Sequence, residues 1–100
     1  MCDDVVKEWK EYIELIPVLE NKVESAKRIL VAKQLEEDKK TDYNKLYGAK
    51  NDKVRKHHYN MVLSEDMAKV DELQQELDTA NRMLSLTKFL AYMKLEKNVL

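Results

Sequence analysis

The chain has 100 residues, enough for one domain with a modest core, so we expect part of its apolar surface to be shared between subunits. With 37% charged and 44% apolar residues but one glycine and one proline, the composition excludes disordered and collagen-like sequence and favours long helices. The single cysteine excludes an intramolecular disulfide, and no apolar stretch is long enough to cross a bilayer. We therefore expect a cytoplasmic protein with no membrane partner.

The first forty-seven residues predict a short helix followed by a long one. Asp3 and Asp4 suit an N-cap and first turn, and helical spacing of apolar residues predicts a helix over 4–16. Pro17 lacks the N–H that would continue this helix, so we expect a break there and a second helix over 18–47. The apolar stripe of this second helix comprises Leu19, Val23, Ala26 and Leu30.

Gly48 is the one glycine, and it stands where a helix C-cap is expected. The pattern after it is not cleanly helical, so we interpret 48–64 as a basic connecting loop. Ser64, followed by two acids, is a typical start for the last long helix, expected over 65–96.

The last helix carries a regular seam at alternating spacings of three and four residues, as a packed helix pair requires. The seam comprises Val70, Leu73, Leu77, Ala80, Leu84, Thr87 and Ala91. We therefore predict an all-α fold in which two long helices form an antiparallel hairpin, preceded by the short helix. The whole chain, 1–100, is expected to be one helical domain.

The stretch 83–95 is apolar nearly all round, which requires cover on several sides. Self-association as a homo-oligomer would supply that cover. The expected interface comprises Met83, Leu84, Leu86, Phe89, Leu90 and Met93. Alternatively, the N-terminal helix, with Trp9 and Tyr12, folds over this stretch within the monomer.

The formal net charge of −1 hides a strong separation of charge along the chain. Positions 39–59 contain seven basic and two acidic residues, and three of the five tyrosines also lie there. Lysines for phosphates combined with aromatic faces for bases favour binding of single-stranded nucleic acid. The candidate binding residues are Lys39, Lys40, Tyr43, Lys45, Tyr47, Lys50, Lys53, Arg55, Lys56 and Tyr59. Equally, the lysines could form a solvated surface while the tyrosines pack at a helix end.

The sequence offers little for catalysis. His57 and His58 are adjacent, and neither has an acid three or four residues further on to complete a metal-binding pair. A glycine-rich phosphate loop is excluded because there is one glycine. We therefore expect a protein that is not an enzyme, with no catalytic residues, no metal site and no cofactor.

Two stretches, "IPVLENK…LYG" and "VLSEDMAKVDELQ", together resemble the UvsY-type recombination mediators of T-even-type phages. The residues that carry the resemblance are Pro17, Leu19, Lys22, Lys39, Lys40, Lys45, Tyr47 and Gly48, and then Val62, Leu63, Ser64, Asp66, Lys69, Val70, Asp71, Leu73 and Gln74. The chain departs from the family in having Leu46 where the family has a second aromatic residue, and in a shorter connecting segment and C-terminal tail.

The resemblance implies a ring-like homo-oligomer in the host cytoplasm that binds single-stranded DNA. It also implies contacts with a RecA-like recombinase and with a single-strand binding protein. The mediator would help the recombinase to replace the binding protein on the strand. Two other functions stay open: a small phage-encoded helical adaptor or inhibitor that binds a host protein, and a helical scaffolding subunit.

Overall fold

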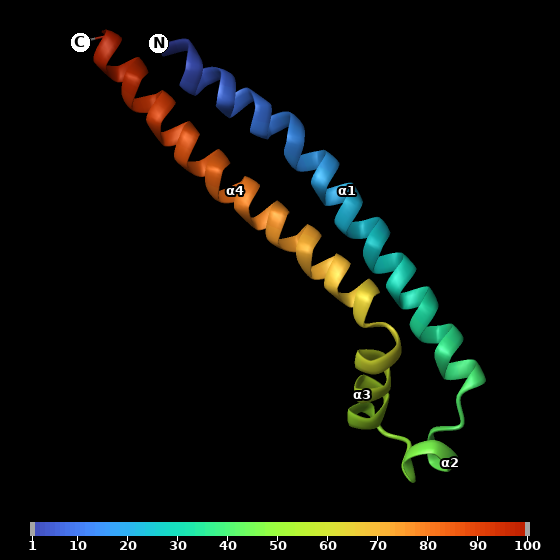
Figure 1. Cartoon of the computed structure of the whole chain (residues 1–100). Helices are drawn as coiled ribbons and strands as arrows, with labels where there is room; N and C mark the ends of the chain where they lie inside the picture. The colour runs from blue at the N-terminus through green and yellow to red at the C-terminus, as the bar shows by residue number, and fades with distance from the viewer. Residues whose placement is uncertain (1, 100) are drawn as a thin grey trace. The chain divides into compact units, whose positions relative to one another are not determined.

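The computed structural model describes residues 2–99, with side chains described for 4–94, and over these residues it contains helices and no strand. The helices are α1 (Cys2–Lys40), α2 (Tyr43–Tyr47), α3 (Asp52–Val62) and α4 (Ser64–Val99) (Figure 1). The expected cap Asp3 and the apolar Leu95 lie outside the described side chains. Over the described residues, no helix has a stretch sufficiently long and apolar to span a membrane.

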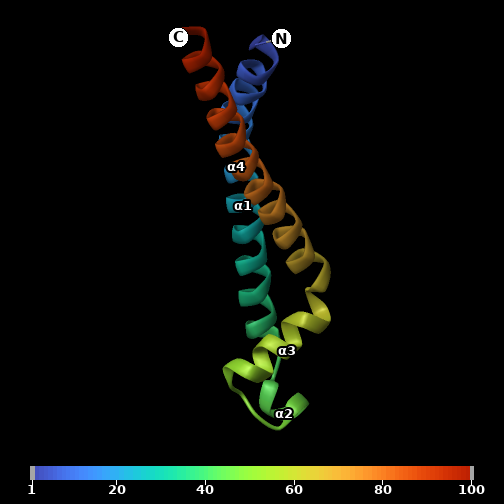
Figure 2. The same ribbon diagram turned by 90° about the vertical axis from the view of Figure 1, so that its left-hand side faces the viewer.

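The described residues group into two compact units. The hairpin unit contains the residues up to Val23 and those from Leu73 onward, and the aromatic unit contains 24–72. Within the hairpin unit, α1 and α4 lie side by side and run in opposite directions (Figures 1 and 2). This arrangement confirms the predicted all-α class and the antiparallel hairpin.

An apolar cluster holds the two helices of the hairpin unit together. Its buried members are Ile16, Leu19, Val23, Leu77 and Ala80, and Tyr12, Leu73 and Leu84 pack against them. These residues recur every three or four positions, so each helix presents one continuous stripe to the other. Full burial of an aliphatic side chain contributes roughly 1.5–3 kcal/mol, so this cluster is the main source of stability in the unit.

Small residues continue the buried stripe towards the end of α4. Ala80, Thr87 and Ala91 are each at most 4% exposed. The Thr87 hydroxyl donates to the carbonyl oxygens of Met83, at 2.8 Å, and Leu84, at 3.1 Å. Because the hydroxyl bonds within its own helix, Thr87 can be buried without an unpaired polar atom. The predicted α4 seam is therefore confirmed from Leu73 to Ala91, whereas Val70 belongs to the aromatic unit.

The expected break at Pro17 is wrong, because α1 runs through it without interruption. A proline inside a helix loses one hydrogen bond and costs about 3 kcal/mol. Pro17 is exposed, whereas Ile16 and Leu19 on either side are buried in the same cluster. Packing of both side chains against α4 requires one helical register, and this packing outweighs the local cost.

In the aromatic unit, the structure differs from the sequence prediction over 18–47 and over 48–64, and it agrees with the prediction at Gly48. The helix predicted over 18–47 ends at Lys40, because the Asp42 carboxylate caps a separate helix, α2, by accepting from the Lys45 N–H at 3.1 Å. The predicted C-cap is confirmed: Gly48 has φ +76° and its N–H donates to the Asn44 carbonyl oxygen at 2.9 Å.

The segment 48–64, expected to be a basic loop, contains helix α3. Its N-cap is Asn51, whose side chain accepts from the Val54 N–H at 2.9 Å. Leu63, which is 7% exposed, separates α3 from α4. The last helix then begins at Ser64, within one residue of the predicted start.

Candidate nucleic-acid interface

The Asp38 carboxylate connects three helices of the aromatic unit. It accepts a hydrogen bond of 2.6 Å from the Tyr43 hydroxyl in α2. The Tyr59 hydroxyl in α3 lies 2.6 and 2.8 Å from its two oxygens. Hydrogen bonds to a charged acceptor are roughly twice as strong as neutral ones. Asp38, in α1, therefore fixes how α2 and α3 pack at this point.

His58 makes a second connection between the same three helices. It is 6% exposed, and its Nε2 lies 3.0 Å from Glu37 Oε2 while its Nδ1 lies 2.7 Å from the Tyr47 hydroxyl. A carboxylate can only accept, so Nε2 carries a hydrogen and donates to Glu37. In the neutral ring Nδ1 then accepts from the Tyr47 hydroxyl. The two ring nitrogens are thus both satisfied.

The protonation of these groups follows from their surroundings. Burial alone would raise the pKa of Asp38, but the hydroxyls of Tyr43 and Tyr59 and the charges of Arg55 and Lys50 hold it below the ordinary 3.8. Burial, followed by the hydrogen bond to Asp38, raises the pKa of both tyrosines. The phenols therefore remain protonated donors and Asp38 remains an ionised acceptor at neutral pH.

Glu37 also holds a lysine. The Lys40 amine lies 2.8 Å from Glu37 Oε1. Hydrogen bonds from Lys40 and then from His58 hold the pKa of Glu37 below its ordinary value, and Glu37 in turn raises the pKa of Lys40. Lys40 thus belongs partly to the network that holds the unit together, although its side chain is 64% exposed.

The tyrosines of the basic segment are mainly packed residues. Tyr43 is 1% exposed, stacks on Tyr47 with ring centroids 6.3 Å apart, and meets His58 edge-on at 5.3 Å. The expectation that the Tyr43 ring is available to a base is therefore wrong for this structure. Tyr47 and Tyr59 are half-buried, with their hydroxyls bonded to His58 and Asp38.

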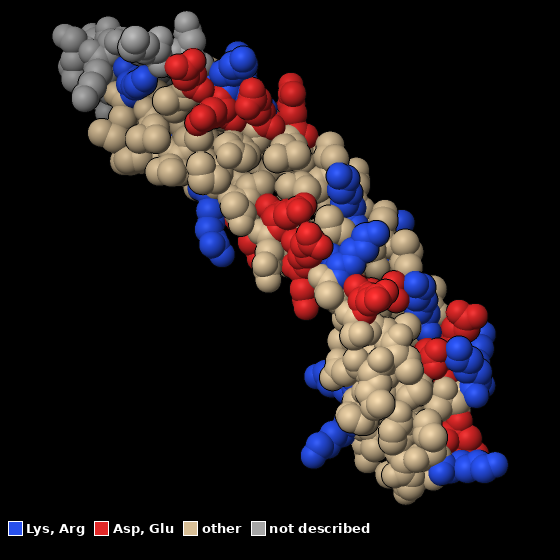
Figure 3. Space-filling view, viewed as in Figure 1, with Lys and Arg blue, Asp and Glu red and all other residues tan. Residues whose placement is uncertain are grey.

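Most of the cations in positions 39–59 are free of ion pairs. Lys40 pairs with Glu37, and Arg55 pairs with Asp52 at 2.6 Å. The other five are exposed and have no ion pair with any described carboxylate: Lys39, Lys45, Lys50, Lys53 and Lys56. In the view of Figure 3, basic side chains project from two sides of the part that contains α2 and α3. The segment 39–59 of the aromatic unit thus has more basic than acidic side chains, and most of its lysines are unpaired.

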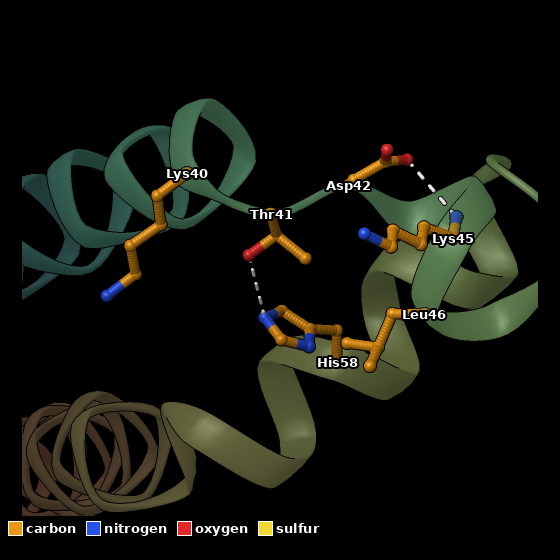
Figure 4. A pocket seen from close by; sticks show the side chains of 6 residues that line it. All are labelled: Lys40, Thr41, Asp42, Lys45, Leu46 and His58. Carbon is orange, nitrogen blue, oxygen red and sulfur yellow. Dashed lines mark hydrogen bonds between the residues drawn. The ribbon is translucent and has the colours of Figure 1, made fainter.

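An open pocket of about 500 Å³ lies among the ends of these helices. Its lining consists of Lys40, Thr41, Asp42, Lys45, Leu46 and His58 (Figure 4). Leu46 is 62% exposed and Lys45 is one of the unpaired lysines. The pocket therefore combines cations with an accessible apolar side chain.

The residues expected at an oligomer interface divide into two groups. Leu84 packs against the intrachain cluster and Met83 is partly buried, so Leu84 belongs to the hairpin seam. The other four are exposed: Leu86 at 48%, Phe89 at 61%, Leu90 at 41% and Met93 at 43%. Trp9 and Tyr12 are partly buried, yet α1 leaves these four uncovered over the described residues.

The sequence did not indicate Glu37, Asp38 or His58 as organising residues. Glu37 and Asp38 resemble any solvated acidic pair on a helix, and His58 lies 21 residues from Glu37. One signal was available: three acids, Glu36, Glu37 and Asp38, stand directly before a segment rich in lysine and tyrosine, which supplies hydrogen-bond donors. Among the described residues, no group of three or more histidines, cysteines or acids is arranged to hold a metal ion.

Comparison of the chain with protein-family models, curated proteins and solved structures gives no match. The resemblance to UvsY-type mediators therefore rests on the sequence motifs alone.

Proposed function

We propose that this protein binds single-stranded DNA through the basic residues of the aromatic unit and serves as a recombination mediator. The observation that supports this most is the set of five exposed lysines, between Lys39 and Lys56, that form no ion pair with a described carboxylate. Each such lysine can replace a condensed counterion on a phosphate backbone, which makes binding favourable and salt-dependent.

Two arguments favour a single strand over a duplex. An accessible apolar side chain, Leu46, lies beside the unpaired Lys45, and unstacked bases offer an apolar face to such a residue. The sequence resemblance independently favours a single strand. It also supplies the mediator role, in which the protein contacts a RecA-like recombinase and a single-strand binding protein.

Self-association forms the second part of this proposed function. The exposed apolar side chains of α4, from Leu86 to Met93, would pack against further copies of the chain. A homo-oligomer would present several basic sites to one strand, and linked sites bind far more tightly than single ones. Modest charge on each aromatic unit would then be sufficient for stable binding.

The binding is tested by titrating a labelled oligothymidine at ~50 mM salt. We expect tight, salt-sensitive binding that weakens when Lys39, Lys40 and Lys45 are all changed to Ala. The matched control changes Lys7, Lys10 and Lys22 to Ala, which removes the same charge from α1 outside the basic segment. Absence of wild-type binding, or equal weakening by both triple variants, would contradict the proposal.

The assembly is tested by light scattering with and without the oligonucleotide. We expect a mass above that of the 11.8 kDa monomer at micromolar concentration, and a fall in mass for the Phe89→Asp variant. A monomeric wild type would contradict self-association. A single stoichiometric protein captured from host lysate, with indifference to DNA, would instead favour the adaptor function.

A further inference from the structure

The pocket next to α2 has a specific distribution of polar and apolar groups. Figure 4 shows the Lys45 amine pointing towards the Thr41 side of the pocket, with Leu46 beside His58. The Asp42 carboxylate points away, and its Oδ1 accepts from the Lys45 backbone N–H. Asp42 is therefore engaged in capping α2 and does not pair with the Lys45 amine.

The size and openness of the pocket limit its occupant. Its volume of about 500 Å³ is within the range of sites for small organic ligands. The pocket is open to solvent, which suits one unit of a polymer better than an enclosed small molecule. An unpaired ammonium recognises a phosphate, and an exposed apolar side chain recognises the face of a base.

We propose that this pocket holds one nucleotide of a bound strand, with its phosphate at the Lys45 amine and its base against Leu46. The buried ring of His58, beside Leu46, and the Thr41 hydroxyl complete the lining, and hydrogen bonds with Glu37 hold both groups in place. This inference rests on the proposed binding of single-stranded DNA and assigns it to a particular contact. The base contact is an aliphatic one, because the tyrosines of the segment are packed.

The inference predicts that an aromatic ring at position 46 strengthens binding. A base stacks more favourably on an aromatic side chain than on an aliphatic one, so we expect Leu46→Tyr to bind oligothymidine roughly tenfold more tightly than wild type. Leu46→Ala should bind several-fold more weakly. Because Leu46 is 62% exposed, both variants should fold normally, as circular dichroism would check.

Met61 provides a matched control. It lies in α3 of the same unit, is 64% exposed and does not line the pocket. Met61→Tyr and Met61→Ala should bind oligothymidine as wild type does. If the two tyrosine variants tighten binding equally, or neither does, the pocket is not where a base is held.

A mononucleotide separates failure of this inference from failure of the proposed function. In NMR spectra, addition of dTMP should shift the resonances of the Leu46 methyl groups and of the His58 imidazole. Inorganic phosphate should leave the Leu46 methyl resonances unchanged. Lys45→Ala should abolish the dTMP shifts, whereas Lys69→Ala, another exposed lysine of this unit, should not. If dTMP shifts the Leu46 resonances but the protein does not bind oligothymidine, the proposed function is wrong and the pocket binds free nucleotides. Oligothymidine binding without such shifts would reject the pocket alone.

Discussion

The two units of this chain are held together by different chemistry. The hairpin unit has a periodic apolar stripe on each of two helices, with Leu19 and Leu77 among its buried members. The buried residues of the aromatic unit include Tyr43 and His58, which are fixed by short hydrogen bonds to adjacent carboxylates. Apolar packing tolerates exchange of one hydrophobic residue for another, whereas hydrogen-bonded aromatic packing requires particular atoms at particular distances.

Charged side chains therefore have different roles in the two units. In the hairpin unit, charged side chains lie outside the apolar cluster and contribute little. In the aromatic unit, three elements share a network in which Glu37 pairs with Lys40 and with His58, and Asp38 orients the hydroxyls of two tyrosines. Five further lysines between positions 39 and 56 stay unpaired. Glu37 and Asp38 therefore satisfy the interior, while the unpaired lysines of positions 39–56 remain at the surface.

Removal of the Tyr43 side chain should have the largest effect on stability, and it tests the hydrogen-bonded packing of the aromatic unit. Tyr43→Ala deletes a side chain that is 1% exposed and one donor to Asp38, so we expect a loss of about 3–5 kcal/mol in the free energy of unfolding. Chemical denaturation measures the loss, and hydrogen exchange should place it mainly in 41–62. Tyr43→Phe keeps the ring and should cost only about 1–2 kcal/mol. Equal costs for the two variants would show that the hydroxyl, and not the ring, holds the unit.

A truncation in the hairpin unit should have a somewhat smaller effect. Leu77→Ala removes a residue that is 9% exposed from the apolar cluster, and we expect a loss of about 2–4 kcal/mol. Leu77→Met preserves volume and should cost less than about 1.5 kcal/mol, which tests the tolerance of apolar packing directly. Gln75→Ala, on the exposed side of α4, is the control. A large loss for Leu77→Met would contradict the contrast between the units.

Acid should affect the aromatic unit through Asp38. Because hydrogen bonds hold the pKa of Asp38 below 3.8 in the folded state, its stabilising contribution is complete above that value and is lost as the pH falls through the lower folded-state pKa. Asp38→Asn should therefore lower stability by about 1–2 kcal/mol at neutral pH and flatten the decline below about pH 4. Urea denaturation across this pH range measures both. An unchanged acid profile, with exposed Asp71→Asn as control, would show that Asp38 does not carry this dependence.

The parts of the fold that the sequence predicted are those with a repeating or local physical signature. The α4 seam follows from spacing, because buried positions on a packed helix recur every three or four residues. Gly48 at the end of α2 follows from its freedom to adopt a positive φ. Both arguments need only neighbouring residues.

The parts that were missed depend on contacts between distant residues. Pro17 indicated a break, and packing of its neighbours in the hairpin core overrides that local preference. Helix α3 has no apolar stripe, because the side chains it buries or half-buries include His58 and Tyr59, whose partners Glu37 and Asp38 lie 21 residues earlier. Tyr43 was assigned to the binding surface because its packing against His58, in another helix, could not be inferred from local spacing. Of the candidate site, the sequence indicated the lysines as binding residues, which stays a prediction, and it gave no sign of the pocket.

The smallest expected effect is on stability when an unpaired lysine is removed. Lys45→Ala deletes an exposed amine without an ion-pair partner, and its backbone N–H still donates to Asp42, so the free energy of unfolding should change by less than about 0.5 kcal/mol. Lys53→Ala should behave in the same way. Thermal denaturation beside oligothymidine binding measures both properties of each variant. Loss of binding without loss of stability would show that these lysines are available to a ligand and are not needed for folding. This agrees with carboxylates that are bonded to other groups of the aromatic unit. If Lys45→Ala instead unfolds the unit as Tyr43→Ala does, charge and packing are not separate there.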